Sequence, residues 1–384
     1  MDTSIRRIGI LTSGGDAPGL NAVIRSVVKT AILRHGWEVI GVRDGFEGLL
    51  DGGRTQRLGL EEVSGLLPRG GSLLGCTNRG HMRNTAAGVA HANSEALSDA
   101  AATVTRLGLD ALIVVGGDGS HRIAAQLSAR GVPLIGVPKT IDNDLPGTET
   151  TFGFDSAVAF ATEAIDRLHT TAESHGRVLV VEVMGRGAGW IALHAGIAGG
   201  ADVILIPEIP YDLTAAAAHI VARASGGKPF SIVVAAESAL PIAALGEGRA
   251  GSQRGHAGIA GRVADELQIL TGRETRAVVL GHLQRGGAPT AADRLLATAF
   301  GAAAVAAIAN RQFGQMLVWR SGRIETVAIA EATGAPRVVA ALHPLLETAR
   351  GLGISFAAPD EALPSRKACA DPLPIREAFA LARE

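Results

Sequence analysis

The sequence predicts an α/β protein built from two doubly wound, Rossmann-like lobes with mainly parallel sheets, and three observations lead to this prediction. Short aliphatic runs recur along the chain, most of them closed by Gly or Pro, and Ala-rich segments follow them. Nearly continuous apolar strands that alternate with helices are typical of parallel sheets covered on both faces. The 384 residues exceed one typical domain, which favours two lobes.

Eight runs meet this description, and we expect each of them to be a β-strand. In chain order they are residues 8–12, 38–42, 111–115, 134–137, 178–183, 203–206, 231–235 and 277–280. In doubly wound folds, ligands bind just beyond the carboxyl ends of the strands. Glycines and charged side chains follow several of these runs directly, so we expect the functional site at these strand ends.

The composition argues against several classes of function. The 36 basic and 37 acidic residues nearly cancel, and a net charge of −1 gives no general attraction to nucleic acid or to an anionic membrane. No apolar stretch approaches the roughly 20 residues that cross a bilayer, and the N-terminal run is typical of a first strand rather than a signal peptide. The two cysteines, Cys76 and Cys369, lack metal-ligand spacing. We expect a reduced, cytoplasmic protein that binds anions through local groups.

Two glycine-rich loops are candidate phosphate sites. The sequence GGDGS at residues 116–120 follows one predicted strand and precedes a helix. Its glycines let backbone N–H groups approach a phosphate chain, and a helix N-terminus favours an anion. Asp118 then offers a carboxylate to Mg²⁺, although an ordinary strand-to-helix turn has the same features. A similar loop, GGDAPG at residues 14–19, follows the first strand, and neither loop matches the P-loop pattern.

The segment PKTIDND at residues 138–144 carries groups suited to catalysis. Only four of the 36 basic residues are lysines, and Lys139 is one of them. Phosphoryl transfer to an alcohol requires a carboxylate that accepts the hydroxyl proton, close to cations that offset the charge of the donor. Asp142 fits the role of this base, with Asp144 as a secondary or structural group. A solvated acidic turn is the simpler alternative.

Four arginines at or next to strand ends are candidate ligands of a sugar phosphate, namely Arg177, Arg186, Arg276 and Arg285, with His282 close to the last. Planar guanidinium groups bind phosphate through two parallel hydrogen bonds, and they stabilise negative charge in a transition state. In a chain so rich in arginine, a surface or structural role explains any one of the four alone.

Taken together, six segments resemble the phosphofructokinase family and appear in the order found in that family. They are LTSGGDAPGLNAVIR, GGDGS, PKTIDND, TEAIDRL, SHGRVLVVEVMGR and GRETRAVVLGHLQRGG, and they span roughly residues 5–320. The resemblance implies a kinase of glycolysis. Such an enzyme transfers a phosphoryl group from a magnesium-bound donor to the 1-hydroxyl of fructose 6-phosphate and forms fructose 1,6-bisphosphate.

The resemblance also implies roles for individual residues. Those implied to bind the phosphate donor are Gly15, Arg79, Gly117, Asp118, Gly119 and Ser120, with Asp118 as the Mg²⁺ ligand. Those implied to bind the sugar phosphate are Thr140, Ile141, Asp142, Arg177, Met184, Gly185, Arg186, Glu237, Arg276, His282, Leu283, Gln284 and Arg285. Those implied to act in catalysis are Asp142 as the base, with Lys139, Thr140 and Arg186.

Two positions bear on the identity of the donor. Pyrophosphate-dependent members of the family usually have Asp at the position of Gly119, and its carboxylate occupies the space of the nucleotide α-phosphate. They commonly have Lys at the position of Lys139, where ATP-specific bacterial enzymes have Gly. Because an Asp excludes ATP whereas an extra cation only assists, we expect ATP as the donor, in a subgroup related to the pyrophosphate-dependent enzymes. Pyrophosphate is the alternative.

The resemblance implies how the chain divides. We expect a phosphate-donor lobe formed by residues 1–153 and about 270–325, and a fructose 6-phosphate lobe formed by about 154–269. Residues from about 326 to 384 are expected to form C-terminal helices and an extension. In the family, the counterparts of Arg177 and Arg276 reach the site of a neighbouring subunit. A homo-oligomer, either a dimer or a tetramer, is therefore implied.

Two other functions compete with this one. Another kinase with a GGDG-type loop, such as a NAD kinase or a lipid kinase, accounts for residues 116–120 but not for PKTIDND or GHLQRGG. A non-catalytic subunit that only binds a sugar phosphate is disfavoured, because Asp118, Asp142 and Arg186 are all present.

Overall fold

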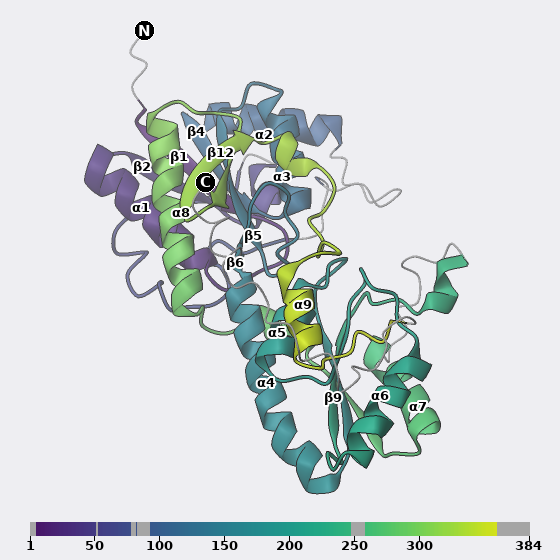
Figure 1. The fold of residues 1–384 in the computed structure, drawn as a ribbon. Helices are drawn as coiled ribbons and strands as arrows, with labels where there is room; N and C mark the ends of the chain where they lie inside the picture. Colours follow the sequence, from purple (N-terminus) through teal and green to yellow (C-terminus); the bar gives the residue numbers. More distant parts are fainter. Residues whose placement is uncertain (1–4, 51–52, 78–81, 83–92, 247–257, 359–384) are drawn as a thin grey trace.

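The computed structural model describes residues 5–50, 53–77, 82, 93–246 and 258–358, which form two lobes with one sheet each (Figure 1). In the larger lobe, 8 strands of the described residues form one sheet in the order β12-β11-β5-β4-β1-β2-β3, with β6 paired to β5. They are β1 (Arg7–Thr12), β2 (Glu38–Val42), β3 (Thr55–Leu58), β4 (Ala111–Gly116), β5 (Leu134–Thr140), β6 (Phe152–Gly153), β11 (Gln315–Arg320) and β12 (Arg323–Ala328). All neighbours are parallel except β3 and β12, which pair antiparallel at the two edges.

Helices cover both faces of this sheet, because its strands alternate apolar side chains between two cores. Ile113 of β4 belongs to the core beneath α1 and α8, whereas the adjacent Leu112 and Val114 belong to the core beneath α2 and α3. In Figure 1, α1 and α8 lie side by side. The helices of this lobe are α1 (Leu20–His35), α2 (Ser94–Arg106), α3 (Asp118–Ser128) and α8 (Ala291–Ala309), with the 3-10 helices η1 (Gly45–Leu49) and η5 (Glu331–Thr333).

The smaller lobe has a fully parallel sheet of 4 strands in the order β10-β7-β9-β8. These strands are β7 (Val178–Val183), β8 (Val203–Leu205), β9 (Ser231–Ala236) and β10 (Thr275–Val279). One face packs on α4 (Phe154–His175), α5 (Trp190–Ala198) and α9 (Pro344–Gly351), and the other on α6 (Leu213–Ser225) and α7 (Gly258–Thr271). Two 3-10 helices, η3 (Ile242–Gly246) and η4 (Gly281–Arg285), complete it. This architecture confirms the predicted fold class.

The predicted strands agree with the observed ones except at their ends. Strand β5 continues three residues beyond the predicted segment 134–137, and β10 begins two residues before the predicted segment 277–280. The sequence analysis did not identify β3, β6, β11 or β12. β3 and β12 are edge strands in which polar residues interrupt the apolar ones, so they lack the continuous apolar run of a central strand.

Two expected boundaries of the lobes differ from the sheet assignment. We expected the donor lobe to resume near residue 270, but β10 pairs with β7 and therefore belongs to the smaller sheet. The chain returns to the larger lobe with α8, which packs on α1. The expected boundary near residue 326 falls inside β12, which pairs with β11. The helix α9 then packs on the smaller lobe.

Helix α8 corrects the expectation that no apolar stretch approaches the length of a membrane span. Its 19 residues have a mean hydropathy of 1.5, so it is long and apolar enough by length and composition alone. Phe300 and Ala304 of this helix are fully buried in the core that α8 shares with α1. A core helix satisfies the same criterion, and packing against the larger sheet accounts for the apolar character of α8.

A buried carboxylate joins the beginnings of α4 and α8, where the chain passes between the lobes. One oxygen of Asp293 accepts hydrogen bonds from the backbone N–H of Ser156 at 2.8 Å and from its hydroxyl at 2.6 Å. The Ser156 hydroxyl in turn accepts a hydrogen bond from the N–H of Thr290 at 3.0 Å. Asp293 of α8 thus satisfies two polar groups of α4, a helix that packs on the smaller sheet.

We predict that Asp293→Ala lowers the free energy of unfolding by about 1–3 kcal/mol, because buried donors of Ser156 lose their acceptor. Chemical denaturation at neutral pH measures this change. Asp166→Ala is the matched control, since Asp166 lies exposed on α4. Equal stability of the two variants would contradict the role of Asp293.

Candidate active site

The carboxyl ends of the two sheets meet, and contacts between the lobes establish this. Arg186, which follows β7 in the smaller lobe, lies 3.7 Å from a carboxylate oxygen of Asp144, which follows β5 in the larger lobe. Arg285, at the end of η4, donates a hydrogen bond of 3.0 Å to the carbonyl of Asp16 in the loop after β1. The strand ends expected to form the site are therefore in contact.

The glycine loop GGDGS at residues 116–120 forms the beginning of α3, as expected. Gly117 caps the helix in an extended conformation, and Asp118 is its first residue. A Cβ at Gly116 would lie 2.3 Å from the Cβ of Ser120, so no larger residue fits there. Asp118 accepts a hydrogen bond of 2.9 Å from Arg122 one turn later, a pairing that the i, i+4 spacing could have revealed. The N-terminus of α3 follows the carboxyl end of β4, and a helix N-terminus favours an anion.

Lys139 contacts the glycine loop of residues 14–19. It lies at the end of β5, is only 3% exposed, and donates a hydrogen bond to the carbonyl of Gly15. The pKa of Lys139 is lowered to about 8, chiefly by burial and in smaller part by the charge of Arg285, whereas Cys76 and Asp142 oppose the shift. The ammonium group of Lys139 therefore contacts the glycine loop of residues 14–19.

Asp142 has the surroundings of a general base. Its backbone N–H donates to the hydroxyl of Thr140 at 3.0 Å, and that hydroxyl donates to Oδ2 of Asp142 at 3.3 Å. The carboxyl is 5% exposed, and Oδ1 is buried without a hydrogen-bond partner among the described residues. Burial raises the pKa of Asp142, while Arg285, Arg186, Thr140 and Lys139 favour its ionised form. An acceptor oxygen is therefore available for a substrate hydroxyl.

Asp144 forms a coupled pair with Asp142. Burial raises the pKa of Asp144 to about 6, and the charge of Asp142 adds to this effect, whereas Arg186 opposes it. Because repulsion between two carboxylates is mutual, ionisation of either group disfavours ionisation of the other. Ile141 between them is fully buried in the core of the smaller lobe, so its side chain packs and is not presented to a ligand.

The loop after β7 is held in a strained conformation. Gly185 has a φ of 155°, and a Cβ there would lie 2.4 Å from the carbonyl oxygen of Ala188. Arg186 has a left-handed φ of 57°, which is uncommon outside glycine. Its N–H donates a hydrogen bond of 2.8 Å to Glu237, which follows β9. Glu237 thereby fixes the backbone of Arg186, while Met184 packs against the core of this lobe.

The side chains of η4, which follows β10, differ in their exposure to solvent. His282 and Leu283 are exposed, whereas Gln284 is buried and donates to the carbonyl of Gly281 at 3.2 Å. Arg285 is partly buried beside the first glycine loop. Of this predicted group, His282 and Arg285 are therefore the side chains placed to contact a ligand.

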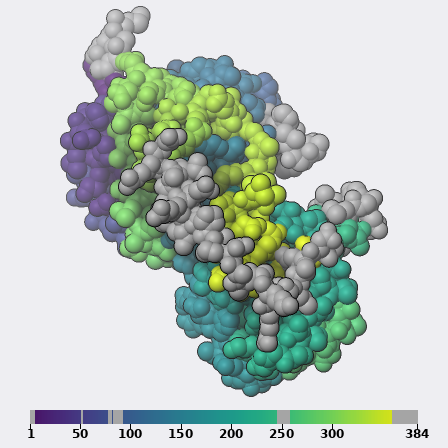
Figure 2. Space-filling model, viewed as in Figure 1, coloured from purple at the N-terminus to yellow at the C-terminus, as the bar shows by residue number. Residues whose placement is uncertain are grey.

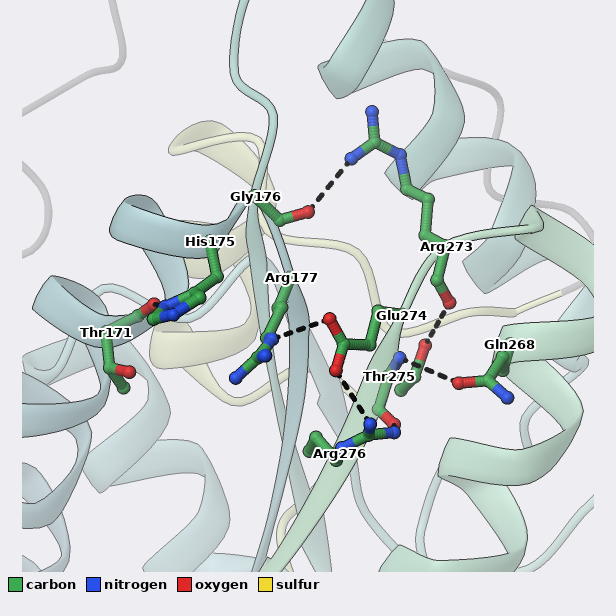
Figure 3. A network of polar contacts seen from close by, with 9 residues as sticks. All are labelled: Thr171, His175, Gly176, Arg177, Gln268, Arg273, Glu274, Thr275 and Arg276. Atoms are coloured by element: carbon green, nitrogen blue, oxygen red, sulfur yellow. Dashed lines mark hydrogen bonds and ion pairs between the residues drawn. The ribbon is translucent and has the colours of Figure 1, made fainter.

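Arg177 and Arg276 lie at the amino ends of the strands of the smaller sheet, opposite the carboxyl ends that meet the larger lobe. Arg177 directly precedes β7 and Arg276 is the second residue of β10 (Figure 3). Both bind the carboxylate of Glu274, at 2.8 Å and 2.7 Å respectively. The 6 residues of β7 separate Arg177 from the loop of Arg186, a distance of about 20 Å at the usual rise of about 3.3 Å per residue. The four candidate arginines are therefore not brought together within one chain.

Two further observations concern ligands. Arg79 lies outside the described residues. Among the residues that the structure describes, no group of three or more His, Cys, Asp and Glu side chains could hold a metal ion. A single carboxylate such as that of Asp118 fits a cation that takes its remaining ligands from phosphate and water.

A cavity of about 410 Å³ beside β2 and β3 is lined by Trp37, Arg57 and Glu62 and contains none of the predicted residues.

The fold and this geometry define a two-lobed α/β protein, with a glycine loop at the start of a helix on one lobe and basic groups on the other. The family model described as Phosphofructokinase matches residues 7–308. This chain belongs to the phosphofructokinase family.

Named relatives agree with this assignment. The chain is 53% identical over 366 residues to an ATP-dependent 6-phosphofructokinase of Chloroflexus aurantiacus, covering 93% of this chain and 99% of that one. It is 51% identical over 340 residues to ATP-dependent 6-phosphofructokinase 3 of Streptomyces coelicolor, covering 87% and 96%. The structure of Pichia pastoris phosphofructokinase in the T-state matches with a TM-score of 0.74 and 30% identity. That match covers 92% of this chain but only 37% of the longer yeast chain.

We predict an acid limb in the pH profile of kcat above the ordinary range of an aspartate, because the base must be ionised and burial raises the pKa of Asp142. As pH falls through that raised value, activity is lost. Asp144→Asn removes a neighbouring negative charge and should shift the limb to lower pH by roughly 1 unit. Steady-state kinetics between pH 4 and 9 (about 1-unit steps suffice at first) measure this. Asp166→Asn should leave the limb in place, and a limb unmoved by Asp144→Asn would refute the coupling.

Proposed function

We propose that this enzyme transfers a phosphoryl group from Mg-ATP to the 1-hydroxyl of fructose 6-phosphate and forms fructose 1,6-bisphosphate. The observation that carries the proposal is Asp142, a buried carboxylate with an unbonded oxygen where the two lobes meet. In the reaction, the hydroxyl oxygen forms a bond to phosphorus, the bond from phosphorus to the leaving ADP oxygen breaks, and the hydroxyl proton passes to Asp142. The chemistry belongs in the cytoplasm, in keeping with the expected reduced thiols.

The larger lobe would bind the donor. Backbone N–H groups at Gly15 and at Gly117 to Ser120 would line the phosphates, with Asp118 holding Mg²⁺. The cation would neutralise charge on the phosphates when it is bound. Arg122 supports this role, because its hydrogen bond at 2.9 Å fixes the position of the Asp118 carboxylate. Lys139 would add a compact positive charge near the transferred group.

The smaller lobe would bind the acceptor. Glu237 would contact sugar hydroxyls, and Met184 and Gly185 would shape the site. His282 and Arg285 would bind the 6-phosphate, and Arg186 would stabilise the migrating group. Thr140 supports Asp142 through the two hydrogen bonds between them.

A neighbouring subunit would complete the site. Arg177 and Arg276 lie at the opposite end of the strands from Arg186, which supports the proposal that they would serve the site of a second molecule. Glu274 holds both guanidinium groups in fixed positions (Figure 3). The enzyme is therefore proposed to be a homo-oligomer, a dimer or a tetramer.

The identity of the donor follows from Gly119 and is supported by the relatives named ATP-dependent. A glycine leaves room for a nucleotide α-phosphate beside the start of α3, whereas an aspartate would repel it. Lys139 is compatible with pyrophosphate, which remains the second candidate donor.

We predict that a coupled assay with fructose 6-phosphate detects turnover with Mg-ATP. Gly119→Asp should reduce that turnover by about 100-fold or more, because a carboxylate would meet the α-phosphate. Gly351→Asp is the control, since an added Cβ at Gly351 meets no atom within 4 Å. Turnover with pyrophosphate and none with ATP would refute ATP as the donor, and undiminished ATP use by Gly119→Asp would refute the role of Gly119.

We predict complementation between two inactive variants, Arg276→Ala and Asp142→Asn. In a randomly mixed oligomer, about a quarter of the sites combine an intact Asp142 with an intact arginine from the neighbour, so about a quarter of the activity should return. Co-expression and measurement of specific activity test this. The control pair, Arg276→Ala with Arg177→Ala, should give no recovery because every site lacks one arginine. Absence of recovery in the first pair would refute the role of these arginines in the site of a neighbouring subunit.

A further inference from the structure

A segment near the C-terminus contacts both lobes beside the candidate site. We call residues 334–339 the C-terminal strap. It follows η5 and lies beyond the residues 7–308 that the family model matches. In Figure 2 the yellow-green and yellow part of the chain, to which the strap belongs, covers the surface where the two lobes meet. Arg337 is the charged residue of this strap.

Arg337 clamps the loop that carries the predicted base. Its guanidinium group donates to the carbonyl oxygens of Asn143 and Glu149, at 2.9 Å each, and so joins the two sides of the loop 143–149. Its backbone N–H donates to the carbonyl of Asp144 at 2.8 Å. Three hydrogen bonds from one residue therefore hold a loop that begins directly after Asp142.

The same residue is anchored to the smaller lobe. The guanidinium carbon of Arg337 lies 4.1 Å from the ring centre of Trp190 at the start of α5. The indole N–H of Trp190 donates to the carbonyl of Arg337 at 3.0 Å. Two residues later, the N–H of Val339 donates at 2.9 Å to Glu208, which also accepts from the N–H of Gly189 at 3.0 Å. The strap therefore braces the loop of Arg186 as well.

The other end of the strap contacts the donor loop. Arg122 donates at 3.4 Å to the carbonyl of Gly334, and the same guanidinium group binds Asp118 at 2.9 Å. The predicted metal ligand and the predicted base are thus each connected to the strap through one arginine.

The bonded atoms indicate why an arginine is needed. Asn143 has a left-handed φ of 52°, a conformation that is uncommon outside glycine although Asn tolerates it better than most residues, and two hydrogen bonds from the strap hold the carbonyl groups of Asn143 and Asp144. A forked, planar donor can bind two carbonyl oxygens at once and stack on an indole ring, whereas a lysine ammonium cannot do both. Hydrogen bonds from a charged donor are also stronger than those from a neutral one.

We propose that Arg337 is a positioning residue, which fixes the backbone of the loop after Asp142 so that this carboxylate and Asp144 face the basic groups of the smaller lobe. The inference rests on the proposed phosphoryl transfer. Arg337 touches no substrate in this account and acts only through the loop.

Arg337→Met tests the inference, because it keeps much of the stem that covers Trp190 but removes every guanidinium hydrogen bond. A shift of about 1 Å in a catalytic group costs on the order of 100-fold in rate, so we expect kcat to fall by roughly 10- to 100-fold with little change in the two KM values. We also expect the acid limb of kcat to move to lower pH, because a loosened loop admits water to the carboxylates. Charges that face this pair are Lys139, Arg186, Arg285 and Asp118.

Arg320→Met is the matched control. Arg320 also donates to a carbonyl of this loop, at 2.7 Å, but to Gly147 at its far tip. We expect its kcat and its acid limb to equal those of the unaltered enzyme. Amide hydrogen exchange of residues 143–149 provides a measurement independent of activity, and it should be faster in Arg337→Met than in Arg320→Met over residues 143 and 144.

The outcomes separate the inference from the proposed function. An unaltered enzyme that does not phosphorylate fructose 6-phosphate would refute the function, while the exchange data would still test the clamp. An active enzyme whose folded Arg337→Met variant keeps its kcat and acid limb would overturn the positioning role. Should Arg337→Met fail to fold, Arg337→Lys decides by the same criteria, with the same changes expected to a smaller degree and unchanged kinetics counting against the role.

Discussion

The site depends on one electrostatic constraint, which is that carboxylates buried in one lobe are balanced by cations from the other. Asp142 and Asp144 are each 5% exposed, and burying such groups is costly unless opposite charge lies close by. Arg186 and Arg285 from the smaller lobe supply that charge. The relative placement of the lobes is therefore part of the chemistry, and the bonds of Asp293, Arg285 and Arg337 between them serve the same end.

Much of the site could be predicted because its parts are local in sequence. In a parallel sheet the carboxyl ends of all strands share one edge, so glycine loops and charged residues that follow strands are brought together without knowledge of the full topology. The alternation of apolar runs and helices likewise determined the fold class. Lys139, one of only four lysines, is buried beside the glycine loop of residues 14–19. Burying a charged group costs free energy, so its presence there indicates a function.

The features that the sequence did not reveal depend on contacts between distant segments or on strand direction. Strands β3 and β12 lack an apolar signal because their role is to close the edges of a sheet. Arg177 precedes β7 whereas Arg186 follows it, so the two residues lie at opposite ends of the same strand. Arg337 binds the loop 143–149 from nearly 200 positions further along the chain, and no periodicity or spacing connects the two.

The ion pairs of Glu274 with Arg177 and Arg276 have a consequence for assembly. Two long, flexible side chains are already ordered within the isolated subunit, so the loss of their rotational freedom occurs during folding and not when the interface forms. One carboxylate between two guanidinium groups also leaves a surplus of positive charge on that surface. In the proposed homo-oligomer, this ordered and positively charged surface would face the phosphate group of a sugar bound to an adjoining copy.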